Sequence, residues 1–213
     1  MPESANKYVK ITPVKSSGSA KVIKSKELTV AEGSKTFKLS NSASIKVTKA
    51  SQKFDLTLGK DTQSFLVAYN YYESYQGDGQ KSGAYIFRPA SNTAKKFSDI
   101  KSIYYAEGAQ NVIIILVGDK TQTKLVFSKV ENYVNNNGFF METYIDSIPI
   151  DDKIGKEVTL NLASNIINKQ TFFTDSNGLE EQKRTLNYRP TWNLTVNEEV
   201  AGNYYPINSH IRI

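Results

Sequence analysis

Few residues in this 213-residue chain could carry out covalent or metal chemistry. His210 is the only histidine, and there is no cysteine. Catalytic zinc needs three protein ligands, commonly including several histidines. Nucleophilic catalysis by a serine would have His210 as its only imidazole base, and the chain has no Gly-x-Ser-x-Gly turn to present that serine. We therefore expect His210 to be packed or exposed rather than a metal ligand or a base, and we predict no metal site.

Carboxylates are numerous, with 21 Asp and Glu residues, but their spacing is uninformative. Hydrolysis of a glycoside with retention needs two carboxyl groups about 5 Å apart. The adjacent pairs Asp151-Asp152 and Glu180-Glu181 lie in turn-like contexts, so we expect them on the solvated surface. Neither a phosphate-binding loop nor a dinucleotide fingerprint is present. We predict no catalytic residue in the chain.

The remaining chemistry suits recognition of a sugar. Aromatic rings stack on pyranose faces, and phenol, amide and guanidinium groups replace the hydrogen bonds that hydroxyls make to water. We expect most of the aromatic residues to pack in the core or across strands. Trp192, the only tryptophan, follows Pro190 closely and is a better candidate for an exposed contact. The aromatic candidates are Tyr69, Tyr71, Tyr72, Tyr85, Tyr188, Trp192, Tyr204 and Tyr205.

The elements that would position these residues are β-strands. Apolar residues alternate with polar ones in short runs separated by turn residues such as Asn41-Ser42 and Gly59-Lys60. Val112–Val117 is uniformly apolar and largely β-branched, which predicts a buried central strand. No apolar three-and-four spacing extends over a useful length, so we predict an all-β chain of two sheets packed face to face. Further strands are expected at 22–30, 35–39, 44–49, 53–58, 84–88, 100–107, 122–130, 138–148, 156–162, 169–174 and 183–189.

Charge and targeting signals limit the functional class. Residues 1–60 hold 12 lysines and four acids, a net charge of +8, whereas the remainder carries −2. The lysines alternate with apolar or small residues, which is typical of edge-strand surfaces; a nucleic-acid partner is not expected. No apolar run approaches the ~18 residues of a membrane helix, so no membrane partner is expected. Residues 1–20 are expected to be a flexible leader and do not resemble a secretory signal. Asn193-Leu194-Thr195 is a candidate glycosylation site at Asn193.

Two stretches carry a family resemblance. Ser82–Pro89 reads Ser-Gly-Ala-Tyr-Ile-Phe-Arg-Pro, and Phe172–Gly178 reads Phe-Phe-Thr-Asp-Ser-Asn-Gly. Together with Gly155–Val158, Tyr188–Leu194 and Val200–Ser209, in order, they resemble the C-terminal β-rich half of the class II α-mannosidases of glycoside hydrolase family 38, lysosomal type. The resemblance covers about residues 65–213, and residues 1–60 match weakly.

This resemblance implies a fold and an origin. The fold would be a partial β super-sandwich of antiparallel strands, galactose-mutarotase-like, with a sandwich domain at 21–213. Members of the family continue beyond the position of Ile213, so the domain is expected to be incomplete at its C-terminus. The chain would then be a fragment of a zinc-dependent retaining enzyme that removes terminal α-mannose from glycoprotein glycans in a lysosomal or vacuolar lumen, or after secretion.

The resemblance also implies a division of labour. Zinc ligands and an aspartate nucleophile belong to an N-terminal α/β barrel, which would be the partner of this domain, so the fragment itself would bind no zinc. Tyr85 would reach the active site and hydrogen-bond a hydroxyl of the zinc-bound mannose, which makes it the predicted substrate-binding residue. Small Gly83 and Ala84 would let the backbone approach a partner closely. Arg88 and Trp192 are candidate sugar contacts. The family usually has Arg where this chain has His210, so a charged contact there is in doubt.

Two alternatives remain open. The first is a stand-alone carbohydrate-binding module built from the same sandwich. The second is a basic structural or nucleic-acid-associated protein, whose binding would weaken steeply with salt.

Overall fold

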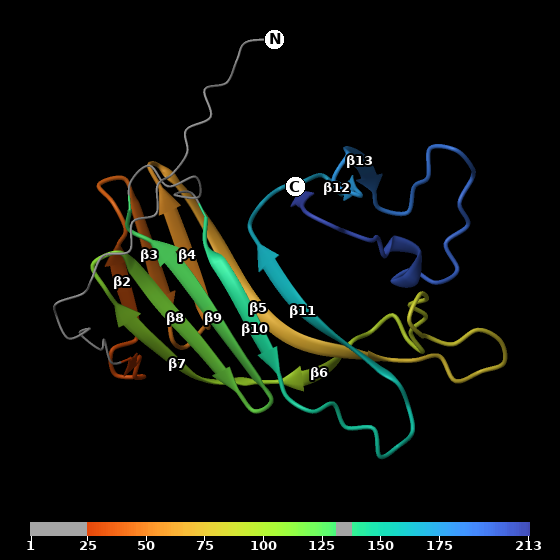
Figure 1. Cartoon of the computed structure of the whole chain (residues 1–213), viewed down its shortest axis with the longest axis horizontal. Coiled ribbons are helices and arrows are strands. Elements are labelled where there is room, and N and C mark those ends of the chain that lie inside the picture. The colour runs from red at the N-terminus through yellow and green to blue at the C-terminus, as the bar shows by residue number, and fades with distance from the viewer. Residues whose placement is uncertain (1–24, 131–137) are drawn as a thin grey trace, which may run out of the picture.

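A computed structural model of the protein describes residues 25–130 and 138–213. Two antiparallel sheets pack face to face, and a small third sheet lies beyond the end of the sandwich (Figure 1). The only helical element in the described residues is a three-residue turn, η1 (Ala201–Asn203), so none of the described helices could cross a bilayer. The predicted all-β sandwich is confirmed. The expected leader, residues 1–20, lies outside the described residues.

The first sheet has its most apolar strand at the centre. Its strand order is β1 (Lys26–Glu27), β7 (Ile100–Glu107), β8 (Asn111–Gly118), β9 (Thr121–Ser128) and β10 (Phe140–Ile145). In β8, Val112, Ile114 and Leu116 are buried while the residues between them are partly covered. This strand is the predicted buried central one, and its β-branched residues suit a pleated surface that is covered on both sides.

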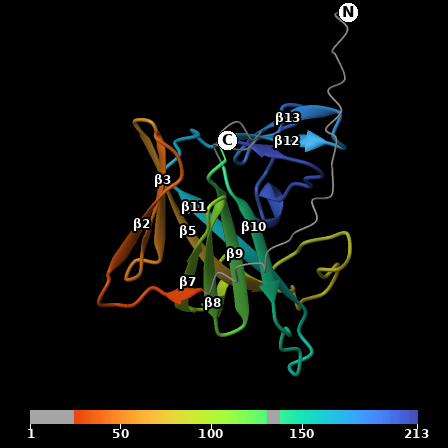
Figure 2. The same ribbon diagram turned by 60° about the vertical axis from the view of Figure 1, so that its left-hand side comes forward.

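The second sheet is built on one long strand. Its order is β11 (Lys156–Ser164), β5 (Asp61–Glu73), β4 (Lys53–Leu58), β3 (Ala43–Thr48) and β2 (Ser34–Lys38), with β6 (Lys95–Ser98) also paired to β5. β5 has 13 residues and extends past the sandwich, where β11 and β6 flank it (Figures 1 and 2). The chain therefore leaves the far end of β5 well away from the sandwich core.

The core lies between these two sheets. Phe37, Ile45 and Phe54 from the second sheet are fully buried, as are Ile114 and Phe127 from the first. Burial of each such side chain contributes about 1.5–3 kcal/mol relative to exposure. All 16 of the buried hydrophobic residues that the structure describes lie between residues 28 and 127. The strands that follow this range add no fully buried apolar side chain.

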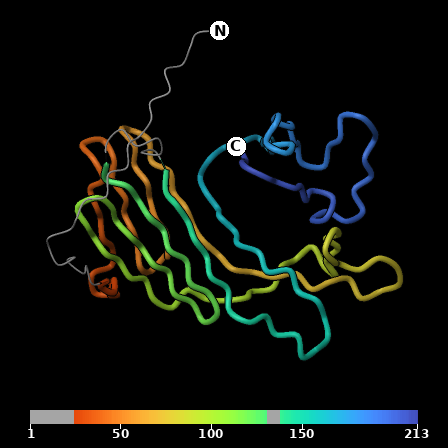
Figure 3. Tube along the Cα trace, viewed as in Figure 1, coloured from red at the N-terminus to blue at the C-terminus, as the bar shows by residue number. Residues whose placement is uncertain are grey.

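The third sheet is small and comes from the C-terminal part of the chain. It has the order β13 (Glu180–Thr185), β12 (Thr171–Ser176) and β14 (Ile211–Arg212). Figure 3 shows the C-terminal segment turning back toward the loop that follows β5. This return brings residues near position 200 beside the signature stretch near position 85.

One predicted strand is wrong. Residues 84–88 alternate like a strand, but the structure has an irregular loop there. The loop spans residues 74–94, between β5 and β6. Its local hydrogen bonds, described next, explain why alternation did not produce a strand.

Candidate substrate-facing loop

The loop after β5 is closed at its base by backbone hydrogen bonds. Tyr75 N donates to Arg88 O over 2.9 Å, and Ala90 N donates to Glu73 O over 2.8 Å. Ser74 forms an isolated bridge with Pro89, and its backbone N–H donates to Gly155 O over 2.9 Å. The two arms of the loop therefore leave the sheet together.

Ser82 closes the signature stretch into a smaller loop. Its hydroxyl donates to Arg88 O over 2.9 Å and accepts from Arg88 N over 2.8 Å, which satisfies both backbone groups of Arg88 with one side chain. Gly83 N donates to Ile86 O over 2.9 Å, so Ala84 and Tyr85 form a two-residue tip. These bonds replace the ladder that a strand at 84–88 would have needed.

Tyr85 stands at this tip with 99% of its surface exposed. The hydroxyl of a ring this exposed is accessible to an external group. Gly83, two residues before Tyr85, also faces open space: a β-carbon there would meet no atom within 4 Å. The described chain therefore gives no steric reason for a glycine at position 83.

Arg88 is held on three sides. Its Nε donates to Glu198 Oε1 over 2.7 Å, its Nη1 donates to Gln80 O over 3.1 Å, and its guanidinium lies 4.0 Å from the centroid of the Tyr75 ring. The side chain keeps only 28% of its surface exposed. Arg88, predicted as a candidate sugar contact, is thus mostly engaged inside the protein.

Phe87 anchors the other side of the tip. Its ring meets the Tyr72 ring edge-on with centroids 5.5 Å apart, and the Tyr204 ring at 5.1 Å. Tyr72 belongs to β5 and Tyr204 follows η1, so Phe87 connects the second sheet to the C-terminal segment. Such aromatic pairs contribute about 0.5–1.5 kcal/mol beyond the area they bury.

The second signature stretch forms a cap for a backbone turn. Asp175 in β12 is almost fully buried, and its Oδ1 accepts from the backbone N–H groups of Asn208, Ser209 and His210 over 2.9 to 3.2 Å. Its Oδ2 accepts from Gly178 N over 2.9 Å. These donors, that of Ser209 first, hold the pKa of the Asp175 carboxyl well below its usual range, against the opposing effect of burial. Asp175 therefore fixes the C-terminal turn as a permanent carboxylate.

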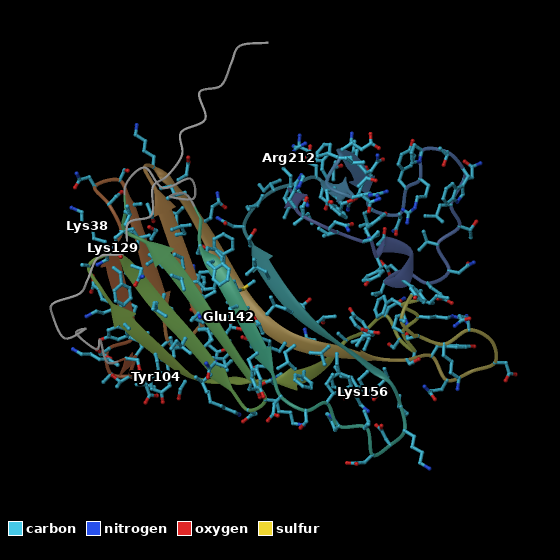
Figure 4. All side chains as sticks on the ribbon, viewed as in Figure 1. Lys38, Tyr104, Lys129, Glu142, Lys156 and Arg212 are labelled. Atoms are coloured by element: carbon cyan, nitrogen blue, oxygen red, sulfur yellow. The ribbon has the colours of Figure 1, made fainter. Side chains whose placement is uncertain are left out.

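Glu181, His210 and Arg212 form a charged cluster on the third sheet (Figure 4 labels Arg212). Arg212 donates from Nε and Nη2 to both Glu181 oxygens, and His210 Nε2 lies 3.2 Å from Glu181 Oε1. Arg212, then His210, lowers the pKa of Glu181 to about 2. His210 is half exposed. Among the described residues, no group of three or more His, Asp or Glu side chains could hold a metal ion.

The other aromatic candidates divide into packed and exposed residues. Tyr69 is buried and donates to Thr123 Oγ1, Tyr71 packs on Phe97, and Tyr205 lies beneath two arginines. Tyr188 and Trp192 are 57% and 58% exposed. They line a shallow hollow of about 560 Å³ formed by residues 187–194, which also includes the exposed sequon residue Asn193.

The two acidic pairs lie at the surface of the protein. Asp151 and Glu180 are exposed, and Asp152 accepts two hydrogen bonds from Lys156 Nζ, each 2.7 Å long. This agrees with the expectation of solvated surface. Sequence reasoning missed Glu198, which is 110 positions from its partner Arg88 and has no local signal.

Comparison with known proteins identifies the family. Residues 44–213 match the family described as "Glycosyl hydrolases family 38 C-terminal domain". Similar proteins include the lysosomal alpha-mannosidase of Dictyostelium discoideum (34% identity over 154 residues, 70% of this chain and 15% of the relative). Others are that of Bos taurus (37% over 153 residues, 68% and 14%) and the alpha-mannosidase of Canavalia ensiformis (36% over 144 residues, 66% and 14%).

The chain thus spans about 15% of the length of these relatives, and its match lies within one described domain. The five quoted stretches, Tyr85 on its braced loop among them, fall inside the matched range. On these findings, the chain belongs to glycosyl hydrolase family 38, as a form of its C-terminal domain.

Proposed function

We propose that this chain is part of a zinc-dependent, retaining α-mannosidase that hydrolyses terminal α-mannose residues of glycoprotein glycans. Its role would be to scaffold the catalytic barrel and to contribute Tyr85 as a substrate contact. The family match and the names of the relatives support this proposal. Because several of those relatives are named lysosomal, we propose a lysosomal or vacuolar lumen, or secretion, for the whole protein.

The observation that carries the proposal is the contrast within the signature loop. Ser82, Phe87 and Arg88 each have partners inside the protein, whereas Tyr85 is 99% exposed at the tip. A loop whose backbone is already fixed by hydrogen bonds loses less conformational entropy when its tip binds. The phenol hydroxyl can donate a hydrogen bond to a sugar hydroxyl or accept one from it. Such a bond replaces the one that the sugar hydroxyl made to water before binding.

The placement of apolar residues supports a partner domain. Of the 21 large hydrophobic residues that the structure describes as exposed, 16 lie at or beyond Phe140, a region with no buried hydrophobic residue. Such a concentration of exposed apolar residues in one part of the chain is what an interface with a further domain would require. We propose that its partner is the N-terminal α/β barrel of the same polypeptide, with mannosyl glycans bound between them.

The described residues do not fit a zinc site, because no three donors of the required types converge. We therefore assign zinc and the aspartate nucleophile to the barrel, and derive no catalytic step for this chain. Within the proposal the isolated chain is inactive. Turnover of an aryl α-mannoside by the 213-residue chain with added zinc, above background, would contradict this.

Substitution of Tyr85 in the complete polypeptide tests the proposed contact. Tyr85→Phe keeps the ring and removes only the hydroxyl. We expect kcat/KM for an aryl α-mannoside to fall about 10- to 100-fold, since a sugar hydroxyl loses its partner. Tyr144→Phe is the matched control, because Tyr144 is 66% exposed on β10. If both variants have the same kcat/KM as the parent protein, the proposed contact is wrong.

A second candidate function rests on the hollow lined by Tyr188 and Trp192. Two half-exposed aromatic rings beside polar groups suit a carbohydrate-binding module. Titration of mannose oligosaccharides with Trp192 fluorescence as the signal separates the two functions. Saturable binding by the 213-residue chain that survives Tyr85→Phe favours the module; no binding favours the enzyme-domain proposal.

A further inference from the structure

We infer that Glu198 is a positioning residue: through Arg88, it fixes the orientation of the loop that presents Tyr85. The inference rests on the proposed function of Tyr85 and extends it to a residue of the C-terminal segment. Glu198 does not touch the tip of the loop. Its effect is transmitted by one guanidinium.

The first step is the connection between Arg88 and the tip. The backbone N–H and C=O of Arg88 are both bonded to the Ser82 hydroxyl. Ser82 and Arg88 are therefore the two ends of the small loop that has Ala84 and Tyr85 at its turn. Any displacement of Arg88 moves one end of this loop relative to the sheet.

The second step is the origin of the contacts on Arg88. Gln80 and Tyr75 belong to the same loop as Arg88. The base of this loop is bonded to β5 and to Gly155, whereas Glu198 belongs to the C-terminal segment and is the partner of the Arg88 side chain that lies outside the loop. Within the described residues, Arg88–Glu198 is the one ion pair between residues 74–94 and residues 165–213. The ring contact between Phe87 and Tyr204 adds an apolar contact between the same two segments.

The third step is the chemistry of the pair. The 2.7 Å bond joins Nε, the guanidinium nitrogen within the side-chain stem, to a carboxylate oxygen. Such a charge-assisted bond is directional. The ring of Tyr75 covers the guanidinium face at the same time. Together they restrict rotation of the guanidinium, which a flexible surface arginine would retain. Two partners of different kinds orient a group better than either partner alone.

Two measurements test the inference, with Glu198→Ala as the variant and Glu199→Ala as its neighbouring control. In the complete polypeptide, we expect Glu198→Ala to lower kcat/KM about three- to tenfold, because misplaced contacts reduce productive binding. In the Tyr85→Phe background, Glu198→Ala should cause no further loss of kcat/KM. In the 213-residue chain, hydrogen exchange at the amides of Gly83 and Arg88 should accelerate roughly tenfold in Glu198→Ala alone.

The outcomes separate the inference from the proposed function. An equal loss of activity from Glu198→Ala with Tyr85 and with Phe at position 85, or unchanged exchange at Gly83 and Arg88, overturns the positioning role alone. Full activity of Tyr85→Phe overturns the proposed function and the positioning role with it. Should Glu198→Ala unfold, Glu198→Gln and Arg88→Lys serve instead: the first keeps the shape of the side chain and removes its charge, and the second keeps the charge and removes the planar fork.

Discussion

Gly83 gives a direct test of whether the signature loop is shaped by its own chain or by a partner. A β-carbon at this position would meet no atom within 4 Å, and the backbone is not in the left-handed region. Gly83→Ala should therefore leave the free energy of unfolding of the 213-residue chain unchanged, or raise it by up to about 1 kcal/mol through a less flexible unfolded state.

Gly118 is the matched comparison within the sandwich. A β-carbon there would lie 2.5 Å from Ser98 Oγ, 2.6 Å from Thr121 Oγ1 and 2.7 Å from Asp99 O. Ser98 Oγ also accepts hydrogen bonds from Thr121 and from the backbone N–H of Lys120. Overpacking together with loss of one such bond should cost about 3 kcal/mol. The melting temperature should fall by about 6–12 °C.

The same two variants separate stability from activity in the complete polypeptide. If a partner domain packs close to the loop, the added methyl at position 83 must displace it, and kcat/KM should fall about fivefold or more. Chemical denaturation of the 213-residue chain and turnover of an aryl α-mannoside by the complete polypeptide are the two assays. Full activity of Gly83→Ala would refute the reasoning that small residues admit a partner here.

Three further outcomes follow from other contacts. Because Arg212 lowers the pKa of Glu181 from 4.5 to about 2, this pair stabilises the folded chain fully above pH 4.5 and loses its effect as the pH falls toward 2; Glu181→Gln should flatten that part of the melting-temperature profile. Tyr69→Phe should cost about 1 kcal/mol in denaturant unfolding, since Thr123 keeps its second hydroxyl partner on β10. Asn193→Gln should abolish a glycosidase-sensitive mass shift if the sequon is used in a luminal host.

Local patterns were sufficient for most of the fold. Alternation predicted most strands of both large sheets because one face of each is buried against the other, but β5 and β6 were not among the predicted strands. The failure at residues 84–88 has a definite cause. Ala84, Ile86 and Arg88 alternate with aromatic residues as in a strand, but no neighbouring strand is available, and the Ser82 hydroxyl takes both backbone groups of Arg88 instead.

The site was predictable only in part. Tyr85 emerged from a family resemblance, and its exposure at the tip of the loop is what an external partner would require. The bracing by Glu198 could not be predicted, because a single glutamate 110 residues from Arg88 has no periodicity to reveal it. Asp175 was visible as part of a signature stretch, but its role as a cap depends on a turn at Asn208–His210, which only the fold brings near.

If the family carries Arg at position 210, as the resemblance implies, the cap formed by Asp175 limits the effect of the difference. Asp175 binds the backbone N–H of residue 210, a group that any residue except proline supplies. The turn is therefore indifferent to the side chain, which points to Glu181 instead. An arginine there could make the same pairing with more donors. Since Arg212 already neutralises Glu181, the exchange alters the charge at the surface of the third sheet and leaves the turn, and the segment that carries Glu198, in place.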